Sequence, residues 1–461
     1  MTTVTVRELD TTALAERVRG ELIGPGDAGY DEARSLYNAM VDKHPALIVR
    51  CVDVADVIAT IDFARDSGLP LAVRGGSHNP AGFGSVDGGV VVDLTRMKGI
   101  RVDPSAQLAT VQGGCTWGDV DHATHAYGLA TVGGVLSTTG MGLALGGGIG
   151  YLSRKHGLSV DNLVSADVVL ADGTPVTASA DEHEDLFWAI RGGGGNFGVV
   201  TSLTFRLHPH KTIMWGPMLW PIDRAAEIMR AYDGWLADAP EDLNGFFAFL
   251  SVPPGPPFPE ELHNQTVCGI VWCHTGSAEE AAQALAPARE TGPVLDLVHE
   301  APYPMAQGAF DALFPPGHQH YWRADFVDEL SDEAIAAHVE HGSNLPTPQA
   351  QMHLYPVDGA VHSVGAADTA FAYRDSRWAE VIFAADPDPA KADPIKTWVV
   401  DYYDATHPHS AGGAYVNFMM DEGDERVRAS YRDNYERLAE VKKRYDPANL
   451  FRANQNIRPA G

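Results

Sequence analysis

A segment dominated by glycine around one histidine constrains the fold more than any other part of the sequence. It runs VRGGSHNPAGFGSVDGG from Val73 to Gly89 and surrounds the imidazole of His78. A turn needs only one or two glycines, since few of its positions require a positive φ angle. We therefore expect a large flat or anionic ligand to lie against the main chain of this segment.

A second glycine-rich stretch, GMGLALGGGIG from Gly140 to Gly150, supports the same expectation. Successive backbone N–H groups left accessible by glycine bind phosphate without needing a lysine. The sequence carries no G-x-x-x-x-G-K-[ST] motif, so a nucleotide triphosphatase is not expected. Close packing of helices on a sheet is the alternative explanation, and it accounts for a few of these glycines but not easily for all of them.

The stretch RGGGGNFG satisfies the dinucleotide-binding pattern G-x-G-x-x-G at Gly193, Gly195 and Gly198. That mechanism needs a strand, a glycine turn and then a helix, so that the pyrophosphate meets the N-terminus of the helix. Here acidic residues open a helix near Asp181, the glycines end it, and a β-branched strand follows. The order is reversed, and a Rossmann site is excluded.

The remaining pattern predicts an α+β chain divided into three segments. From Ala46 a strand, a helix and a strand follow one another as in a βαβ unit. From about 212 to 410, helices near 223–237, 277–290 and 331–341 alternate with strands such as NGFFAFLSV, TVCGIVWC, HYWRADFV and QMHLYPVDGAV. This region is expected to form a second domain on a mainly antiparallel sheet.

Glycines cluster again at Gly412, after which we expect a strand AYVNFMM and then one charged helix from Asp424 to Tyr445. The tail is therefore expected to return to the first domain. The predicted boundaries are 1–207, 208–411 and 412–461.

The balance of charges excludes two classes of partner. The 461 residues hold 33 lysines and arginines against 61 aspartates and glutamates, a formal net charge of −28. Nucleic acids and anionic membranes are bound through clustered Lys and Arg, so we expect neither partner. No apolar run approaches a membrane span, and the first 18 residues lack the pattern of a secretory signal. With four cysteines that show no metal-type clustering, we expect a cytoplasmic protein with buried, reduced thiols.

Four blocks of the sequence together resemble a known family. They are VRGGSHNPAGFGSVDGGVVVDLTRM, GGGIGYLSRKHGLSVDNL, LFWAIRGGGGNFGVVT and the closing YVNFMM…YDPANLFRANQNI. In this order they resemble the FAD-linked oxidases with the vanillyl-alcohol-oxidase type of flavin fold, in the berberine-bridge-enzyme-like branch. The chain resembles in particular bacterial 6-hydroxynicotine oxidases and flavin oxidases that tailor polyketides. The resemblance implies a two-domain PCMH-type FAD-binding fold and an FAD-dependent oxidase.

The resemblance also implies where FAD is held. His78 matches the histidine that the family joins covalently to the 8α-methyl carbon of the flavin, a bond that raises its reduction potential. The residues expected to bind the cofactor are Arg74, Gly75, Gly76, Ser77, His78, Asn79, Gly134, Val135, Gly140, Gly142, Gly147, Gly148, Gly150, Asn162, Gly198, Val200, Tyr415, Asn417, Asn454 and Asn456.

Two positions depart from the family or refine it. Many relatives attach the flavin a second time through a cysteine, but Leu136 stands at that place and Cys115 is too far upstream. We therefore expect a single covalent link. Thr139 falls where the family controls access of oxygen to the flavin, and its small side chain favours an oxidase that uses dioxygen.

An oxidase must remove a proton from its substrate while hydride leaves for the flavin. Tyr415 and Asn417 share a face of the expected strand AYVNF and match a family segment beside the flavin, and His353 stands on another strand where relatives often have a glutamate. We expect Tyr415 to accept or orient the proton, with His353 as a second candidate catalytic residue or a structural histidine.

The pairs His318/His320 and His407/His409 have spacing that suits a metal on a strand, but no carboxylate or cysteine completes either set, so no metal site is expected. The substrate is expected to be a neutral or anionic small organic molecule, an alcohol, an amine or a phenol or polyketide, bound in a pocket under the antiparallel sheet. A flavin-dependent tailoring oxygenase and a flavin-binding protein without turnover stay open as alternatives.

Overall fold

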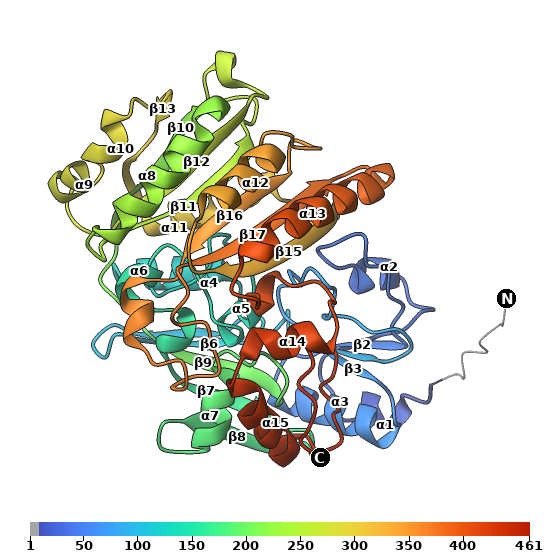
Figure 1. Cartoon of the computed structure of the whole chain (residues 1–461). Helices are drawn as coiled ribbons and strands as arrows, with labels where there is room; N and C mark the ends of the chain where they lie inside the picture. The colour runs from blue at the N-terminus through green and yellow to red at the C-terminus, as the bar shows by residue number, and fades with distance from the viewer. Residues whose placement is uncertain (1–8) are drawn as a thin grey trace.

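The computed structural model describes residues 9–461, arranged around three β-sheets (Figure 1). The stretch that lacks a secretory-signal pattern begins in residues 1–8, outside this range. The strands of the two smaller sheets are β1 Glu21–Ile23, β2 Leu47–Arg50, β3 Leu71–Arg74 and β4 Val90–Asp93 in one, and β5 Ile100–Asp103, β6 Leu108–Gln112, β7 Leu163–Val169, β8 Pro175–Ser179 and β9 Val199–Arg206 in the other.

The first sheet has the order β1-β2-β4-β3, and β2, β4 and β3 run parallel. Helix α3 (Val54–Asp66) connects β2 to β3, and the Asp53 side chain caps it by accepting from the backbone N–H of Asp56 at 3.1 Å. The valines of β4 are fully buried, as befits a strand inside a parallel sheet. The expected strand–helix–strand unit is confirmed.

The second sheet is antiparallel, in the order β5-β6-β9-β7-β8. Helix α7 (Glu184–Ile190) precedes the turn at Gly192–Gly195, and β9 follows it. The order helix, glycine turn, strand is therefore as predicted, and the exclusion of a Rossmann site holds. The other helices of this half are α1 Thr12–Ala15, α2 Tyr30–Arg34, α4 Trp117–His125, α5 Gly142–Leu145 and α6 Ser153–His156.

The large sheet has eight strands, with the path β13-β10-β12-β11-β16-β17-β15 and β14 paired to β10. All its pairings are antiparallel, which confirms the expected sheet type. Its strands are β10 Thr212–Pro221, β11 Leu243–Ser251, β12 Thr266–His274, β13 Leu295–Asp296, β14 His299–Pro302, β15 Gln319–Val327, β16 Gln351–Pro356 and β17 Trp378–Asp386.

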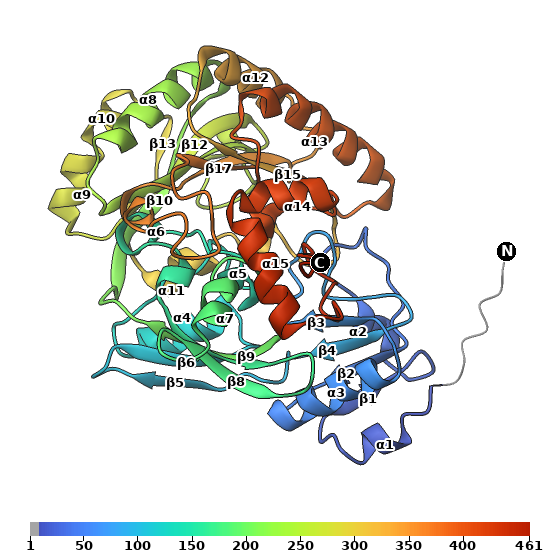
Figure 2. The ribbon, with the colours of Figure 1, turned by 60° about the horizontal axis from the view of Figure 1, so that its bottom comes forward.

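Helices cover one face of this sheet, and the smaller sheets lie beyond the other face (Figures 1 and 2). Alternate residues of β11 show the division, because Phe247 and Phe249 join the core beneath the helices while Phe246 joins the core on the opposite face. The helices of this region are α8 Ala225–Ala237, α9 Ala278–Ala284, α10 Ala286–Glu290, α11 Tyr303–Gly308, α12 Asp332–Gly342 and α13 Ala392–Thr406.

Three local predictions are wrong. The stretch AYVNFMM is not a strand: Val416–Phe418 forms a 3-10 turn beside the glycine-rich loops. The single helix expected over 424–445 is two helices, α14 Asp424–Tyr431 and α15 Asn434–Tyr445, because Arg432 adopts a φ of 46° with its guanidinium over the ring of Tyr373. The helix expected over 277–290 also divides, at Pro287 in the first turn of α10.

Two long strands and one long helix between residues 212 and 410 were not predicted from the sequence: β10, β17 and α13. Strand β10 contains Gly216, Pro217 and Pro221, which argue against a strand. It tolerates them because its outer edge is divided between two short strands, β13 and β14.

The strands of the smaller sheets end at Arg206, those of the large sheet begin at Thr212, and the C-terminal tail packs on α7. The tail is fixed there by Tyr445, whose hydroxyl donates to Asp185 at 2.8 Å, and by Arg437, whose guanidinium lies over Trp188. We retain 1–207, 208–411 and 412–461 as proposed domain boundaries.

Candidate active site

Two neighbouring cavities share part of their walls: the first lies among the smaller sheets and the C-terminal tail, and the second lies beneath the large sheet. The first has a volume of about 230 Å³ and the second about 150 Å³. Both are lined by His78, Thr139, Leu143 and Asn417. A molecule in one cavity would therefore meet a molecule in the other at these four residues.

Main-chain atoms of glycine-rich loops form much of the first cavity. The loop after β3 and the loop before α5 touch through their backbones, so that a Cβ on Gly76 would lie 2.5 Å from the nitrogen of Gly140. The described residues that line the cavity include no Asp or Glu, and their one cation, Arg74, is paired with Asp93 of β4. The cavity thus suits an anionic ligand held by backbone N–H groups.

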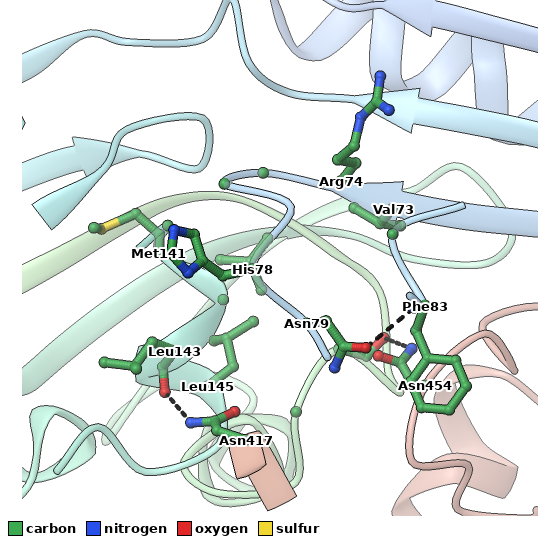
Figure 3. Close-up of a pocket in the computed structure, with 18 of the residues that line it drawn as sticks. Val73, Arg74, His78, Asn79, Phe83, Met141, Leu143, Leu145, Asn417 and Asn454 are labelled. Carbon is green, nitrogen blue, oxygen red and sulfur yellow. Dashed lines mark hydrogen bonds between the residues drawn. The ribbon is translucent and has the colours of Figure 1, made fainter. Parts of the chain in front are cut away.

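His78 lies on the loop that follows β3, close to Met141 and Asn79 (Figure 3). Its ring stacks on Tyr37, with 3.9 Å between the ring centroids and 26° between the planes. Burial lowers the pKa of His78 to about 4, because the charged imidazolium loses its hydration. The imidazole is therefore neutral at physiological pH and has a free nitrogen lone pair.

The C-terminal tail completes the far wall of the first cavity with Ala453, Asn454 and Gln455. Asn454 donates to the carbonyl of Gly195 at 3.2 Å, which joins the tail to the turn after α7. Lys442 is fully buried, and its ammonium donates to Asp446 at 2.7 Å and to backbone carbonyls on both sides. The tail is thereby held where the cavity needs it.

Side chains of the large sheet form the second cavity. Six of its strands contribute apolar or aromatic residues, with Phe246 and Val381 among them, and the α11–β15 segment adds Phe310 and Phe314. This matches the expectation of a substrate pocket beneath the antiparallel sheet. Val135 and Leu136 close the side next to the first cavity.

Tyr415 lines the second cavity next to Asn417, which both cavities share, and three N–H groups point at the Tyr415 hydroxyl oxygen. Gly148 donates at 2.7 Å, Ile149 at 3.4 Å, and the side-chain amide of Asn417 at 2.6 Å. The Asn417 amide also donates to the carbonyl of Leu143 at 2.9 Å (Figure 3). Burial raises the pKa of Tyr415 to about 12, although the three donors lower it. Such donors stabilise a phenolate when the proton is removed.

A row of hydrogen-bonded side chains on β16 faces the second cavity. His353 Nε2 lies 2.6 Å from Gln351 Oε1, and His353 Nδ1 lies 2.8 Å from the hydroxyl of Tyr355. Burial lowers the pKa of His353 to about 3, so this ring is neutral too. His353 is therefore suited to holding its neighbours rather than to collecting a proton.

Most of the residues predicted to bind the cofactor line one of the two cavities. The first is lined by Arg74, Gly75, Gly76, Ser77, His78, Asn79, Gly140, Gly142, Gly198, Val200, Asn417 and Asn454. The second adds Gly134, Val135 and Tyr415, and it is also lined by His353, the second catalytic candidate.

Five predicted residues lie outside both cavities, and for four of them protein atoms explain the tight fit. A Cβ on Gly148 would lie 1.9 Å from Ser159 Oγ, and one on Gly150 would lie 2.1 Å from a backbone oxygen. Gly147 similarly touches the rings of Phe371 and Tyr415. Asn162 donates to two backbone carbonyls and pairs with His208, and Asn456 also lies outside both cavities. Packing and hydrogen bonds within the protein account for these four positions, and their role in binding the cofactor stays a prediction.

Three further observations concern the cysteines, the histidine pairs and the metal-type or membrane-spanning features considered in the sequence. Cys51, Cys115, Cys268 and Cys273 are free and buried, as expected. One histidine of each pair has another partner, since His318 contacts Gln349 and His407 contacts Asp325. Within residues 9–461, no cluster of three or more metal-type ligands is present, and no helix combines the length and hydropathy of a bilayer span.

Tyr37 and Phe246 line the second cavity although no motif pointed to them, and His320, noted in the sequence only as one of a histidine pair, lines it too. Tyr37 comes from the loop after α2, and its hydroxyl donates to the carbonyl of Phe314. Neither Tyr37 nor Phe246 belongs to a local motif, so no pattern in its own segment could have singled it out.

Comparison with known proteins gives this geometry a family context. Residues 45–179 match the model of an FAD binding domain, and residues 414–458 match the model described as berberine and berberine like. An FAD-linked oxidoreductase of Bacillus subtilis (YgaK) is 31% identical over 454 residues, covering 96% of this chain and 98% of the relative. An (R)-6-hydroxynicotine oxidase of Paenarthrobacter nicotinovorans is 31% identical over 468 residues, covering 96% and 98%.

Solved structures agree with the fold expected from the sequence. A 6-hydroxy-D-nicotine oxidase of Arthrobacter nicotinovorans aligns with a TM-score of 0.86 at 26% identity over the whole of both chains. A xylooligosaccharide oxidase of Myceliophthora thermophila aligns with a TM-score of 0.85 at 24% identity, over 97% of this chain and 100% of that one. The two-domain FAD-binding fold and the resemblance stated from the sequence are confirmed.

Proposed function

We propose that this chain, which belongs to the berberine and berberine-like FAD-linked oxidoreductases, is an oxidase that holds FAD in the first cavity and oxidises a small organic molecule in the second. The junction of the two cavities at His78, Thr139, Leu143 and Asn417 is the observation that supports this most strongly. Bound FAD would supply a two-electron acceptor that takes hydride from the substrate and passes the electrons to dioxygen, giving hydrogen peroxide.

The residues of the first cavity fit FAD. Backbone N–H groups of the loops at Gly75–Asn79 and Gly140–Gly142 suit a diphosphate, and the lining residues place no carboxylate against it. The glycine contact between Gly76 and Gly140 leaves no room for side chains there, so the ligand meets bare main chain.

We propose His78 as the single point of covalent attachment, to the 8α-methyl carbon of the flavin. The burial that keeps its imidazole neutral leaves the nitrogen lone pair that such a bond needs, and Tyr37 fixes the plane of the ring. Leu136 lines the second cavity where a thiol would stand in doubly linked relatives, and no cysteine lines either cavity among the residues described. A cysteinyl link is therefore not expected.

Tyr415 is our proposed proton acceptor. The phenolate that accepts the substrate proton would be stabilised by the N–H groups of Gly148, Ile149 and Asn417. Asn417 orients the phenol as well, since its amide is itself fixed on the carbonyl of Leu143. Thr139 offers only a small side chain at the junction, and we propose that it leaves the path for dioxygen open.

An absorption spectrum after acid precipitation tests the proposal, with His78→Ala as the variant. We expect flavin colour in the precipitate of the natural protein and none in that of the variant. Oxygen consumption on a panel of alcohols, amines and phenols then tests turnover. Pigment that washes out in acid would refute the covalent link, and incorporation of oxygen into the product would indicate an oxygenase. Bound flavin without turnover on any member would indicate a flavin-binding protein.

A further inference from the structure

The wall of the second cavity carries no formal charge at neutral pH in its resting state. Among the described residues that line it there is no Asp, Glu, Lys or Arg. Its three histidines are His78, His320 and His353, and burial lowers their pKa values to about 4, 3 and 3. All three are therefore neutral above pH 5.

The charged residues next to the wall in sequence are turned to other partners. Arg323, beside Trp322, pairs with Glu422 at 2.8 Å. Glu380, beside Val381, lies on the helix-covered face of the sheet and accepts from Thr406 at 3.1 Å. Asp311, beside Phe310, accepts from the backbone N–H of Ser137 at 3.0 Å. The alternation of the strands thus keeps charge out of the cavity.

The polar row on β16 has a consistent hydrogen-bond direction. With the Gln351 amide oxygen placed 2.6 Å from His353 Nε2, the neutral ring carries its proton on Nε2, and its Nδ1 accepts from Tyr355. In this arrangement the proton of Tyr355 is held by His353 and is not offered to a ligand. The remaining lone pairs of the Tyr355 oxygen are acceptors, so this point of the wall selects a donor.

We propose, on the basis of the proposed oxidase function, that the substrate is an uncharged, largely apolar ring compound with a hydroxyl or N–H group that donates to the Tyr355 oxygen. Tyr355 and Tyr415 both pack on the ring of Phe418, with centroid distances of 5.7 and 4.8 Å. A ring compound donating to Tyr355 would therefore extend past Phe418 toward Tyr415 and the junction with the first cavity.

The same wall selects against two other classes of substrate. A carboxylate or ammonium would lose its hydration without meeting a counter-charge. A sugar would bury several hydroxyl groups against aliphatic and aromatic side chains, and each unpaired hydroxyl weakens binding. The proposal therefore separates this chain from the carbohydrate oxidases that share its fold.

Isothermal titration calorimetry of the purified protein tests the proposal with four probes. They are 2-naphthol, 2-methoxynaphthalene, naphthalene-2-carboxylate and cellobiose, which differ in the donor, the charge or the apolar ring system. We expect 2-naphthol to bind about tenfold more tightly than 2-methoxynaphthalene, because only the naphthol donates. The carboxylate and cellobiose are expected to bind more weakly than either.

Tyr355→Phe is the decisive variant, and Tyr127→Phe on the exposed surface is its matched control. We expect Tyr355→Phe to remove the tenfold preference for 2-naphthol while leaving the affinity for 2-methoxynaphthalene unchanged. If Tyr355 had only a structural role, Tyr355→Phe would weaken the binding of both probes equally. The control is expected to keep the preference.

The proposed substrate class would be wrong if cellobiose or the carboxylate bound more tightly than 2-naphthol. It would also be wrong if Tyr355→Phe kept the preference for 2-naphthol. Calorimetry does not depend on flavin, so these outcomes are separate from a failure of the proposed function. An acid precipitate without flavin colour would count against the covalent link alone, whatever the probes show.

Discussion

The two cavities meet at one histidine but are built from different material. The first owes its shape to main chain, with loops so close that Gly76 and Gly140 leave no room for a Cβ. The second owes its shape to side chains that project from the large sheet, such as Phe246 and Val381. A main-chain site fixes what it binds by the path of the backbone, whereas a side-chain site can change its ligand through single substitutions. The cofactor and substrate sides of the enzyme therefore differ in how freely they can vary.

Among the variants that test this difference, Gly76→Ala is expected to have the largest effect, because the new methyl group would lie 2.5 Å from the backbone nitrogen of Gly140. We expect the variant to retain no FAD and to be destabilised by about 1–3 kcal/mol. Flavin absorbance per protein and thermal unfolding measure both effects. Gly234→Ala, at an open position of α8, is the control, and it should keep FAD and be slightly more stable. Normal FAD content in Gly76→Ala would contradict a main-chain site.

Tyr415→Phe tests the side-chain part of the junction. We expect kcat/KM to fall by about 10²–10⁴-fold, the usual contribution of a general base, with flavin content unchanged. Steady-state kinetics and the spectrum of the acid precipitate give the two readings. A variant that loses its flavin as well would show that Tyr415 supports the cofactor rather than the proton transfer.

The pH dependence of kcat/KM follows from the same residue. Because the pKa of Tyr415 is raised to about 12, its phenolate is a minor form at pH 7, and its share grows about tenfold per pH unit. We expect kcat/KM to rise about tenfold per unit between pH 7 and 9, while the buried histidines stay neutral. Rate measurements across this range, with Tyr415→Phe as the flat reference, check the slope. A falling profile would assign proton transfer to another group.

Tyr37→Phe should have the smallest effect, and it concerns a residue that touches both regions. The variant keeps the ring that stacks on His78 and loses only the hydrogen bond to the carbonyl of Phe314. We expect a loss of about 1 kcal/mol, seen as a slightly lower thermal midpoint, with covalent flavin unchanged. Tyr37→Ala removes the stack too, and less acid-stable flavin is expected. Equal flavin content in both variants would show that the stack does not position His78.

The first cavity, built from main chain, could be predicted from the sequence better than the second cavity, built from side chains. Glycines in the Val73–Gly89 segment are conspicuous because each marks a place where a side chain is missing. Their meaning was still ambiguous, since Gly148 and Gly150 look the same in sequence but pack on protein. What a glycine faces depends on segments that are distant in sequence.

The side-chain site depends on strand pairing, which periodicity does not reveal. Phe246 and Phe247 are adjacent and chemically identical, yet one joins the core on the cavity side and the other the core beneath the helices. The contact of Tyr37 with His78 joins segments that no short motif connects. Tyr415 and Asn417 were predicted from a family resemblance, and they lie at a turn where a strand was expected.

The make-up of the first cavity also determines when during synthesis of the chain its wall can be complete. Its walls include both Val73–Asn79 and Ala453–Gln455, and the whole eight-stranded sheet is translated between these segments. A nascent polypeptide that ends within that interval would lack the part of the cavity wall formed by the C-terminal tail. If the first cavity holds FAD as proposed, its wall is complete only when Ala453–Gln455 have left the ribosome, so FAD would bind after the chain has been synthesised.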